Sequence, residues 1–344
     1  MSDADGSPAD GVDESPVIDA DESPVVATVG AATVDRHYAV SNLPAPDGGA
    51  FAETVTERFG GVAANVACAV SALGHEAGVV TRLGTDELGD AVATDLREGP
   101  LDTTRVRRGE ADEVSTHCVI LVDDDGTRSI VTAGESVRRL RLDESDRAYL
   151  AASEVVFVTA YAPDTVQQSL AAWSESSSFP PVVFDLSGPL SELEGRGATP
   201  ASIDRWVDRA ALFVVGDVAA DSYLDATGRD AADRLADRGV TRAAVTSGPD
   251  GATLVTRDDE VVGVPARDVE VVDETGAGDA YVGGLIHAWL LAGRSPAVAG
   301  RVAACVAAEN CTAAGARGAH PSRDRAAALL DGWDATDGRD PADR

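Results

Sequence analysis

Short runs of β-branched and other apolar residues alternate with amphipathic stretches along most of the chain. The runs predict buried strands at residues 25–29, 155–158, 182–184, 212–215 and 243–246. The stretches between them predict helices at residues 63–73, 87–96, 164–173 and 229–238. Strands that alternate with helices of this length are typical of βαβ units, so we expect a mainly parallel sheet covered by helices. The last third turns helical, at residues 277–291 and 296–312.

Two segments depart from this rhythm, at about residues 34–60 and 103–134. Both alternate apolar and polar residues, a pattern that predicts antiparallel strands with one buried face. Asp124-Asp125-Gly126 predicts a hairpin turn between strands at 116–123 and 128–133. Because one βα unit separates the segments, they could form one small sheet beside the main one. We expect this sheet to be a lid over a binding cleft, whose exposed strand edges favour a homodimer.

The two ends of the chain differ in composition from the part between them. Residues 1–23 carry eight acidic residues and no basic one, together with Pro, Ser, Gly and Ala. This composition predicts a disordered acidic tail. We expect a second acidic tail at residues 331–344, which leaves a single domain at residues 24–330.

Charge is the unusual feature of the composition. The chain has 59 acidic and 28 basic residues, a net charge of -31, and every basic residue is arginine. Such a charge repels phosphate backbones and anionic membranes, so we expect no nucleic-acid or membrane partner. Concentrated salt would screen the self-repulsion, and we therefore interpret the chain as one from a halophilic archaeon. No signal peptide or membrane-length apolar run is evident, and we expect a cytoplasmic protein.

A glycine-rich turn precedes the helix predicted at residues 277–291. It reads Thr275-Gly276-Ala277-Gly278-Asp279, and it follows Asp273 and a strand predicted at residues 269–272. Glycines before a helix let backbone amides approach an anion, and the helix dipole adds to the attraction. An aspartate beside that anion could accept a proton from a hydroxyl that attacks a phosphoryl group. The alternatives are a simple helix cap and a dinucleotide-binding turn, although Tyr281 stands where the latter needs its third glycine.

A second glycine motif opens the helix predicted at residues 63–73. Gly60 and Gly61 precede it, and Asn65 lies in its first turn. We expect Asn65 to be exposed and to offer both a donor and an acceptor. Taken alone, this motif is no more than a glycine-bounded helix start, of which an α/β protein has several.

Together, and in this order, the two motifs resemble the signatures of the PfkB, or ribokinase-like, family of carbohydrate kinases. The resemblance covers residues 24–330. It implies a three-layer α/β/α domain with a mainly parallel central sheet and a small antiparallel β lid. It also implies an ATP-dependent transfer of the γ-phosphoryl group to a hydroxyl of a sugar or sugar derivative. Family members use Mg2+ brought with ATP, and some of them also bind K+.

The resemblance implies roles for individual residues. Asp279 matches the catalytic base, and Gly276, Ala277 and Gly278 match the anion hole together with Thr275, which we also expect at the nucleotide. The sugar-binding positions match Asp35, Gly60, Gly61 and Asn65. The nucleotide-binding strand end matches Thr246, Gly248 and Gly251. Asp273, with the backbone near Ala313 and Gly318, matches a monovalent-cation site.

The chain also departs from the family pattern. An Asn-x-x-Glu motif is common after the strand that ends here at residue 215, but this chain has Gly216 and Ala219, so Asp217 or Asp221 could substitute. Three alternatives stay open at this point: a nucleoside or sugar-1-phosphate kinase of the same fold, a non-catalytic kinase-like sugar-binding protein, and a dinucleotide-dependent oxidoreductase. The sequence lacks the phosphate-binding fingerprint that the last alternative requires.

Overall fold

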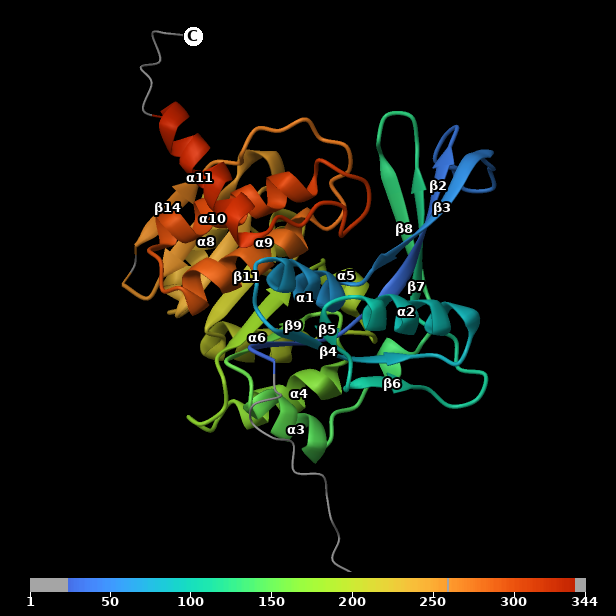
Figure 1. Ribbon diagram of the computed structural model, residues 1–344, viewed down its shortest axis with the longest axis horizontal. Helices are drawn as coiled ribbons and strands as arrows, with labels where there is room; N and C mark the ends of the chain where they lie inside the picture. Colours follow the sequence, from blue (N-terminus) through green and yellow to red (C-terminus); the bar gives the residue numbers. More distant parts are fainter. Residues whose placement is uncertain (1–23, 259, 338–344) are drawn as a thin grey trace, which may run out of the picture.

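The computed structural model of the protein describes residues 24–258 and 260–337. In these residues the main sheet has ten strands, and the five strands predicted from the sequence are all among them (Figure 1). The strands of this sheet are β1 (Val26–Val29), β4 (Ala77–Leu83), β5 (Leu101–Asp102), β6 (Val106–Arg108), β9 (Val155–Thr159), β10 (Val182–Leu186), β11 (Leu212–Gly216), β12 (Arg242–Thr246), β13 (Ala252–Thr256) and β14 (Val261–Val264).

The order of the strands indicates which edge of the main sheet can bind a ligand. It is β14-β13-β12-β11-β10-β9-β1-β4-β5, with β6 also paired to β4. The strands from β5 to β12 run parallel, and β13 and β14 are antiparallel additions at one edge. The chain leaves β1 toward β4 on one side and returns to β9 on the other. In open parallel sheets ligands bind at such a reversal, outside the carboxyl ends of the strands.

Helices cover both faces of the sheet and make the three predicted layers. One face packs against α1 (Val62–Ala72), α2 (Glu87–Glu98), α9 (Ala277–Leu285), a π-helical turn (Ile286–Leu291), α10 (Pro296–Asn310) and α11 (Arg323–Asp337). The other face packs against α3 (Glu144–Ala151), α4 (Asp164–Trp173), α5 (Leu190–Leu193), α6 (Pro200–Arg209), α7 (Asp217–Leu224) and α8 (Gly228–Asp237).

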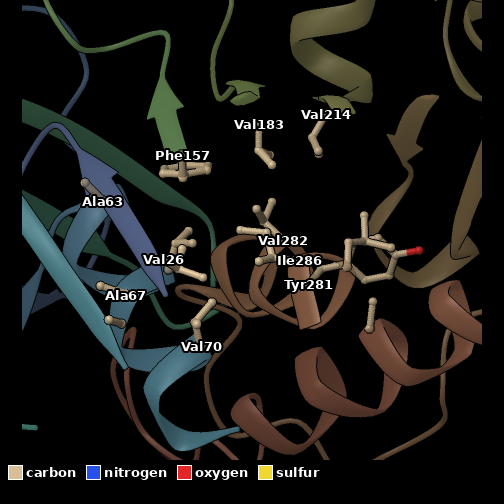
Figure 2. Close-up of a cluster of buried hydrophobic side chains, with 14 of the residues drawn as sticks. Val26, Ala63, Ala67, Val70, Phe157, Val183, Val214, Tyr281, Val282 and Ile286 are labelled. Carbon is tan, nitrogen blue, oxygen red and sulfur yellow. The ribbon is translucent and has the colours of Figure 1, made fainter. Parts of the chain in front are cut away.

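Side chains that alternate along each strand point to opposite faces of the main sheet, so each helix layer has its own hydrophobic core. Val26 of β1 packs under α1 and α9, as Figure 2 shows, whereas its neighbour Ala27 belongs to the cluster on the opposite face. Glycine allows the helices of the first layer to lie very close together. A Cβ added to Gly283 of α9 would lie 2.7 Å from the Cβ of Ala69 in α1. This close approach brings the first turns of the two helices into contact.

The lid is a separate four-stranded sheet in the order β3-β2-β7-β8 (Figure 1). Its two hairpins are antiparallel, and the parallel pairing of β2 with β7 joins them. The predicted turn at Asp124-Asp125-Gly126 is confirmed, since Asp123 Oδ1 accepts hydrogen bonds from the amides of Asp125 and Thr127. The lid strands are β2 (Thr33–Val40), β3 (Ala52–Gly60), β7 (His117–Val122) and β8 (Arg128–Ala133).

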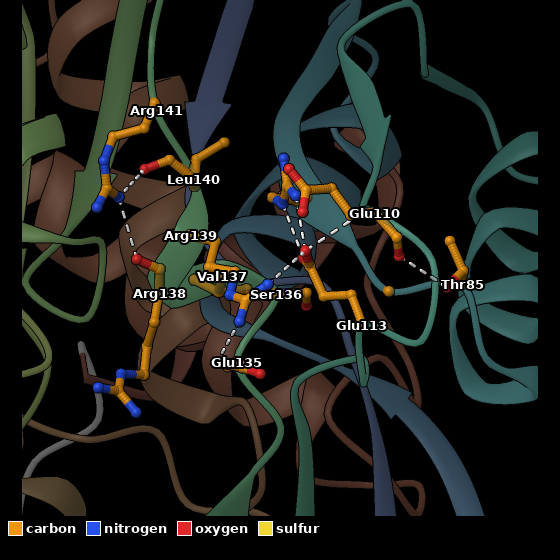
Figure 3. A network of polar contacts seen from close by, with 12 residues as sticks. Thr85, Glu110, Glu113, Glu135, Ser136, Val137, Arg138, Arg139, Leu140 and Arg141 are labelled. Atoms are coloured by element: carbon orange, nitrogen blue, oxygen red, sulfur yellow. Dashed lines mark hydrogen bonds and ion pairs between the residues drawn. The ribbon is translucent and has the colours of Figure 1, made fainter.

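A buried carboxylate fastens the segment that leads into β7. Glu113 is only 2% exposed, and Arg82 at the end of β4 donates two hydrogen bonds to it at 2.7 and 2.6 Å. Arg139 approaches the same carboxylate from the other side, at 3.4 Å (Figure 3). The bonds from Arg82 hold the pKa of Glu113 below its usual range. An ionised, doubly paired carboxylate therefore ties the lid to the main sheet.

Two local predictions are wrong. Residues 269–272 are not a strand, because Val271 and Val272 stand 53% and 60% exposed and have no ladder partner in the described chain. Residues 106–108, placed in the lid by the sequence pattern, instead pair with β4 of the main sheet. The helix predicted at residues 277–291 is confirmed over its whole length, as α-helix to Leu285 and as the π-helical turn from Ile286 to Leu291.

The C-terminal tail predicted from residue 331 is also wrong at its start. α11 continues to Asp337, and Trp333 is 9% exposed. The guanidinium groups of Arg267 and Arg301 lie 5.8 and 5.0 Å from the centre of its ring. A tryptophan covered by cations explains why an acid-rich sequence stays helical here. The predicted tail at residues 1–23 lies outside the described residues, as do residues 338–344. Within the described part, the helices are all too short or too polar to span a bilayer.

Candidate active site

The glycine-rich turn enters α9 through a glycine in the left-handed conformation. Gly276 is the N-cap of α9 and has a left-handed backbone with φ 76°. A Cβ at this position would lie 2.3 Å from the carbonyl oxygen of Ala316, so only glycine fits. At Gly278 an added Cβ would meet nothing within 4 Å. The first amides of a helix have no intrahelical acceptor, and a helix start of this kind can bind an anion.

Asp279 lies in the first turn of α9, beside this glycine-rich turn. Its Oδ2 accepts a hydrogen bond of 2.7 Å from Asn65 Nδ2 in α1. Burial raises the pKa of Asp279 to about 7, and the Asp185 and Asp35 carboxylates act in the same direction, against the bond from Asn65. A carboxylate with a pKa near neutrality can both accept and release a proton at physiological pH.

Asn65 and Arg317 form a short chain of polar contacts behind Asp279. Asn65 is 4% exposed, so the prediction that it is exposed is wrong. Arg317 Nε donates to Asn65 Oδ1 at 2.9 Å. Because arginine can only donate, this contact turns the amide NH2 group of Asn65 toward Asp279. The same guanidinium donates to Asp95 Oδ2 at 2.7 Å and to the carbonyl oxygen of Gly60 at 2.9 Å.

Gly60 and Gly61 leave room for Asp35. A Cβ on Gly60 would lie 2.0 Å from Asp35 Oδ2, and one on Gly61, where φ is 92°, would lie 2.5 Å from the carbonyl oxygen of Ala31. Asp35 is buried on β2, and Thr33 Oγ1 donates to its Oδ1 at 2.9 Å. Burial raises the pKa of Asp35. The structure thus brings together four predicted residues, Asp35, Gly60, Asn65 and Asp279.

Asp185 is a site residue that the sequence motifs missed. It lies in β10, near the carboxyl end of the strand, is 8% exposed, and accepts a hydrogen bond from Ser187 Oγ at 2.5 Å. Burial raises its pKa to about 6. An aspartate at the end of a buried apolar strand was the available signal, since parallel strands end at the ligand-binding edge.

Asp273 accepts hydrogen bonds that fix the loop before the glycine-rich turn at residues 275–279. Its Oδ1 accepts from the Thr275 amide at 2.9 Å, and its Oδ2 accepts from the Gly315 amide at 2.8 Å. Burial acts to raise the pKa of Asp273, but these hydrogen bonds outweigh it and hold the pKa below its usual value. Next to them, Asn310 Nδ2 donates to the Thr275 carbonyl at 3.1 Å, while the buried Asn310 Oδ1 has no partner among the described residues.

The predicted nucleotide residues lie farther along the same sheet edge. Thr246 ends β12, and its Oγ1 would be 3.5 Å from a Cβ on Gly216 at the end of β11. Gly248 and Gly251 both have positive φ, and a Cβ on Gly251 would lie 2.1 Å from the carbonyl oxygen of Val264. These glycines shape the connection between β12 and β13. None of the three residues has a hydrogen bond to Asp279 or Asn65 in the described part of the chain.

Comparisons with known proteins agree with this geometry. The family model described as pfkB family carbohydrate kinase matches residues 24–323. An ATP-dependent ribose-1-phosphate kinase of Halopiger xanaduensis is 30% identical over 306 residues, which cover 89% of this chain and 97% of that protein. A deoxyribokinase of Salmonella typhi is 27% identical over 301 residues, which cover 86% and 95% of the two chains.

A solved structure supports the fold alone. The ribokinase of Arabidopsis thaliana, determined with ribose and ATP, superimposes with a TM-score of 0.77 at 22% identity, over 90% of this chain and 99% of that one. The matched family region contains both glycine motifs and the carboxylates that they bring together. The chain therefore belongs to the pfkB family of carbohydrate kinases.

Proposed function

We propose that this kinase transfers the γ-phosphoryl group of ATP to a hydroxyl of a sugar or sugar derivative, with Asp279 as the general base. The hydroxyl oxygen forms a bond to the γ-phosphorus while the bond from that phosphorus to the β–γ bridging oxygen breaks. ADP leaves, and the hydroxyl proton passes to Asp279. The amides of Gly276, Ala277 and Gly278 would stabilise the charge on the transferring group.

The position of Asp279 carries this proposal. Asp279 lies in the first turn of a helix whose free amides can bind an anion. The pKa of its carboxylate lies near 7, and Asn65 sets its orientation. A non-catalytic sugar-binding protein would not need this arrangement. Among the acceptors, a sugar phosphate is favoured over a nucleoside by the near full-length match to a protein named ribose-1-phosphate kinase.

The variant Asp279→Asn tests the base directly. The amide cannot take the proton, so we expect turnover to fall by about 10^2–10^4-fold in an ADP-release assay in molar KCl. Binding of ATP and sugar should persist, as measured by calorimetry. Asp90→Asn is the matched control, because Asp90 is an exposed aspartate in the first turn of α2 and pairs with Arg108. Full turnover by Asp279→Asn would contradict the assignment.

We also propose that Mg2+ enters with ATP. The described residues contain no group of three or more His, Cys, Asp or Glu side chains able to hold a metal. Nucleotide phosphates and water would then supply most of the ligands, which suits the octahedral preference of Mg2+. Of the two predicted substitutes, Asp217 is engaged through its Oδ1, which accepts from the Gly228 amide at 2.7 Å. Turnover should vanish with excess chelator and return with added Mg2+.

A K+ site at Asp273 is a further part of the proposal. The carboxylate is kept ionised, and the unpartnered Asn310 Oδ1 is close to the Thr275 carbonyl that Asn310 binds. Such oxygens suit a weakly hydrated cation. Replacing KCl by NaCl at equal ionic strength should lower kcat, and Asp273→Asn should remove the difference between the two salts.

The net charge and the exposed strand edges of the lid support a proposal for the cellular environment and the oligomeric state of the protein. We propose a cytoplasmic enzyme of a halophile that binds neither nucleic acid nor membrane, because its net charge is -31. We also propose a homodimer through the lid, whose edge strands β3 and β8 expose Val55, Ile130 and Val131 by 53–58%. Light scattering in molar KCl should give twice the chain mass, and Val131→Glu should give a monomer.

A further inference from the structure

One face of the lid looks toward the catalytic carboxylate. Residues opposite each other in a ladder share a face of the sheet. Asp35 of β2 lies opposite Arg58 of β3 and Cys118 of β7, and Cys118 lies opposite Thr132 of β8. The Sγ of Cys118 is 3.7 Å from Thr132 Oγ1, as this arrangement requires. Asp35 lies against Gly60, whose carbonyl accepts from the same Arg317 that binds Asn65, so this is the face toward the site, here called the inner face.

A histidine and a second arginine also lie on the inner face. Side chains alternate along a strand, so His37 shares the face with Asp35, and the ladder that runs through Ala39 and Val122 places Arg128 there too. Burial lowers the pKa of His37, and the charges of Arg58 and Arg128 lower it further, against Asp35 and Asp273. Both guanidinium groups are therefore close enough to His37 to act on it.

The two arginines of the inner face form no salt bridge within the described residues. Arg58 donates to the carbonyl oxygen of Ala314 at 3.3 Å, and neither it nor Arg128 has a carboxylate partner among the described residues. The Nε2 of His37 is buried without a partner in the same part of the chain. On the outer face of the same strand, by contrast, Arg36 pairs with Glu57 at 2.7 Å. A chain with 59 acidic residues could easily have paired the inner arginines as well.

We infer that the inner face of the lid binds a phosphate carried by the sugar substrate, over His37 and between Arg58 and Arg128. This inference rests on the proposed function and narrows it to the phosphorylation of a sugar phosphate. Guanidinium groups match the geometry of phosphate oxygens and bind them in pairs. Asp35 would bind a hydroxyl of the same sugar. An uncharged sugar or a nucleoside would leave both arginines without an anion when the lid covers the site.

Matched substrates test the inference by turnover. The pairs are ribose with ribose 1-phosphate and fructose with fructose 1-phosphate, assayed by ADP release in molar KCl. We expect one phosphorylated sugar to have a kcat/KM at least about tenfold above that of its parent. Arg58→Gln and Arg128→Gln should each raise its KM by about tenfold or more and leave the KM for ATP unchanged. Arg36→Gln, on the outer face, is the control and should behave as the parent enzyme.

The same data separate two kinds of failure. Preference for a free sugar, with both inner variants equal to the control, would overturn the phosphate site but leave the kinase intact. A raised KM for ATP instead would assign the arginines to the nucleotide and overturn it too. If no sugar is turned over, the proposed function fails, and calorimetry still decides the site. Ribose 1-phosphate or fructose 1-phosphate should bind Asp279→Asn more tightly than the parent sugars do, and no such difference would overturn the inference.

Discussion

At the scale of single residues, the buried carboxylate of Asp279 works against the stability of the fold. Burial raises the pKa of Asp279 from an ordinary value of 3.8 to about 7 in the folded chain. Between these values the folded state holds a proton that the unfolded state has lost. Stability must then fall as pH rises through this window, and it is lowest above the folded pKa.

The stability of Asp279→Asn should show this penalty. The asparagine cannot ionise, so the variant should gain roughly 1–3 kcal/mol over the parent at about pH 8 and little at about pH 4, where the parent is protonated. Denaturant unfolding in molar KCl at both pH values measures the difference. Equal stability of the two proteins at the higher pH would show that Asp279 is not held in an unfavourable charged state.

Arg317 is expected to act through Asn65. Without its bond, the Asn65 amide loses its fixed orientation, so Arg317→Met should lower kcat by about tenfold or more. Its charge also opposes the raised pKa of Asp279, so the midpoint of the rise of kcat/KM with pH should move upward. Arg323→Gln is the control, because Arg323 binds the carbonyl of Leu73 beyond the far end of α1. It should lower stability without moving that midpoint, and an equal shift in both variants would contradict the assignment.

The motifs predicted these site residues unevenly. Asp279, Gly276 and Asp35 became candidates through the resemblance of the sequence to the family signatures. Arg317 did not, because it reaches Asn65 across 252 residues and from a loop without any regular pattern. The burial of Asn65 was missed for the same reason, since it is the distant loop and α9 that cover it.

At the scale of helices and strands, the distance between α1 and α9 sets the geometry of the site. The two helices touch where Gly283 faces Ala69, and the same pair carries Asn65 and Asp279. A side chain inserted at this contact would push the helices apart. Asn65 and Asp279 would separate with them.

Gly283→Ala should therefore affect both stability and activity. We expect a loss of about 1–3 kcal/mol from overpacking, together with a lower kcat. Gly332→Ala is a matched control in α11, where an added Cβ meets nothing within 4 Å, and it should be neutral or stabilising by up to about 1 kcal/mol. Thermal unfolding and turnover of both variants check this. A loss of stability with unchanged kcat would separate the helix contact from the site.

Strands were predictable where burial on both faces produced an apolar run, as in β1, β9 and β10. The pairing of the strands was not predictable, because the pattern of apolar residues shows which faces of a strand are buried and not which strands lie beside it. The parallel union of β2 with β7 and the addition of β6 to the main sheet both follow from this limit. Val271 and Val272 were wrongly predicted to form a strand, because an apolar run that has no partner strand stays an exposed loop.

At the scale of the whole molecule, the net charge of -31 should make stability depend on salt. Raising the salt from about 0.1 M to about 1 M shortens the screening length from about 10 Å to about 3 Å and removes most of the repulsion between surface carboxylates. The melting temperature in KCl, followed by circular dichroism, should rise steeply over this range. A nearly constant melting temperature would show that the acidic surface is not a source of instability.

The parallel contact of β2 with β7 has a consequence for how the chain is made. Val34 pairs with His117, about 80 residues later, so the lid cannot close until α1, β4 and α2 have been synthesised. Until then the first hairpin leaves the ribosome with an open strand edge, in a cell interior crowded with other nascent chains. The charged and polar residues that alternate along β2 and β3, among them Arg36, Glu53 and Glu57, would keep that edge from sticking to other strands while it waits.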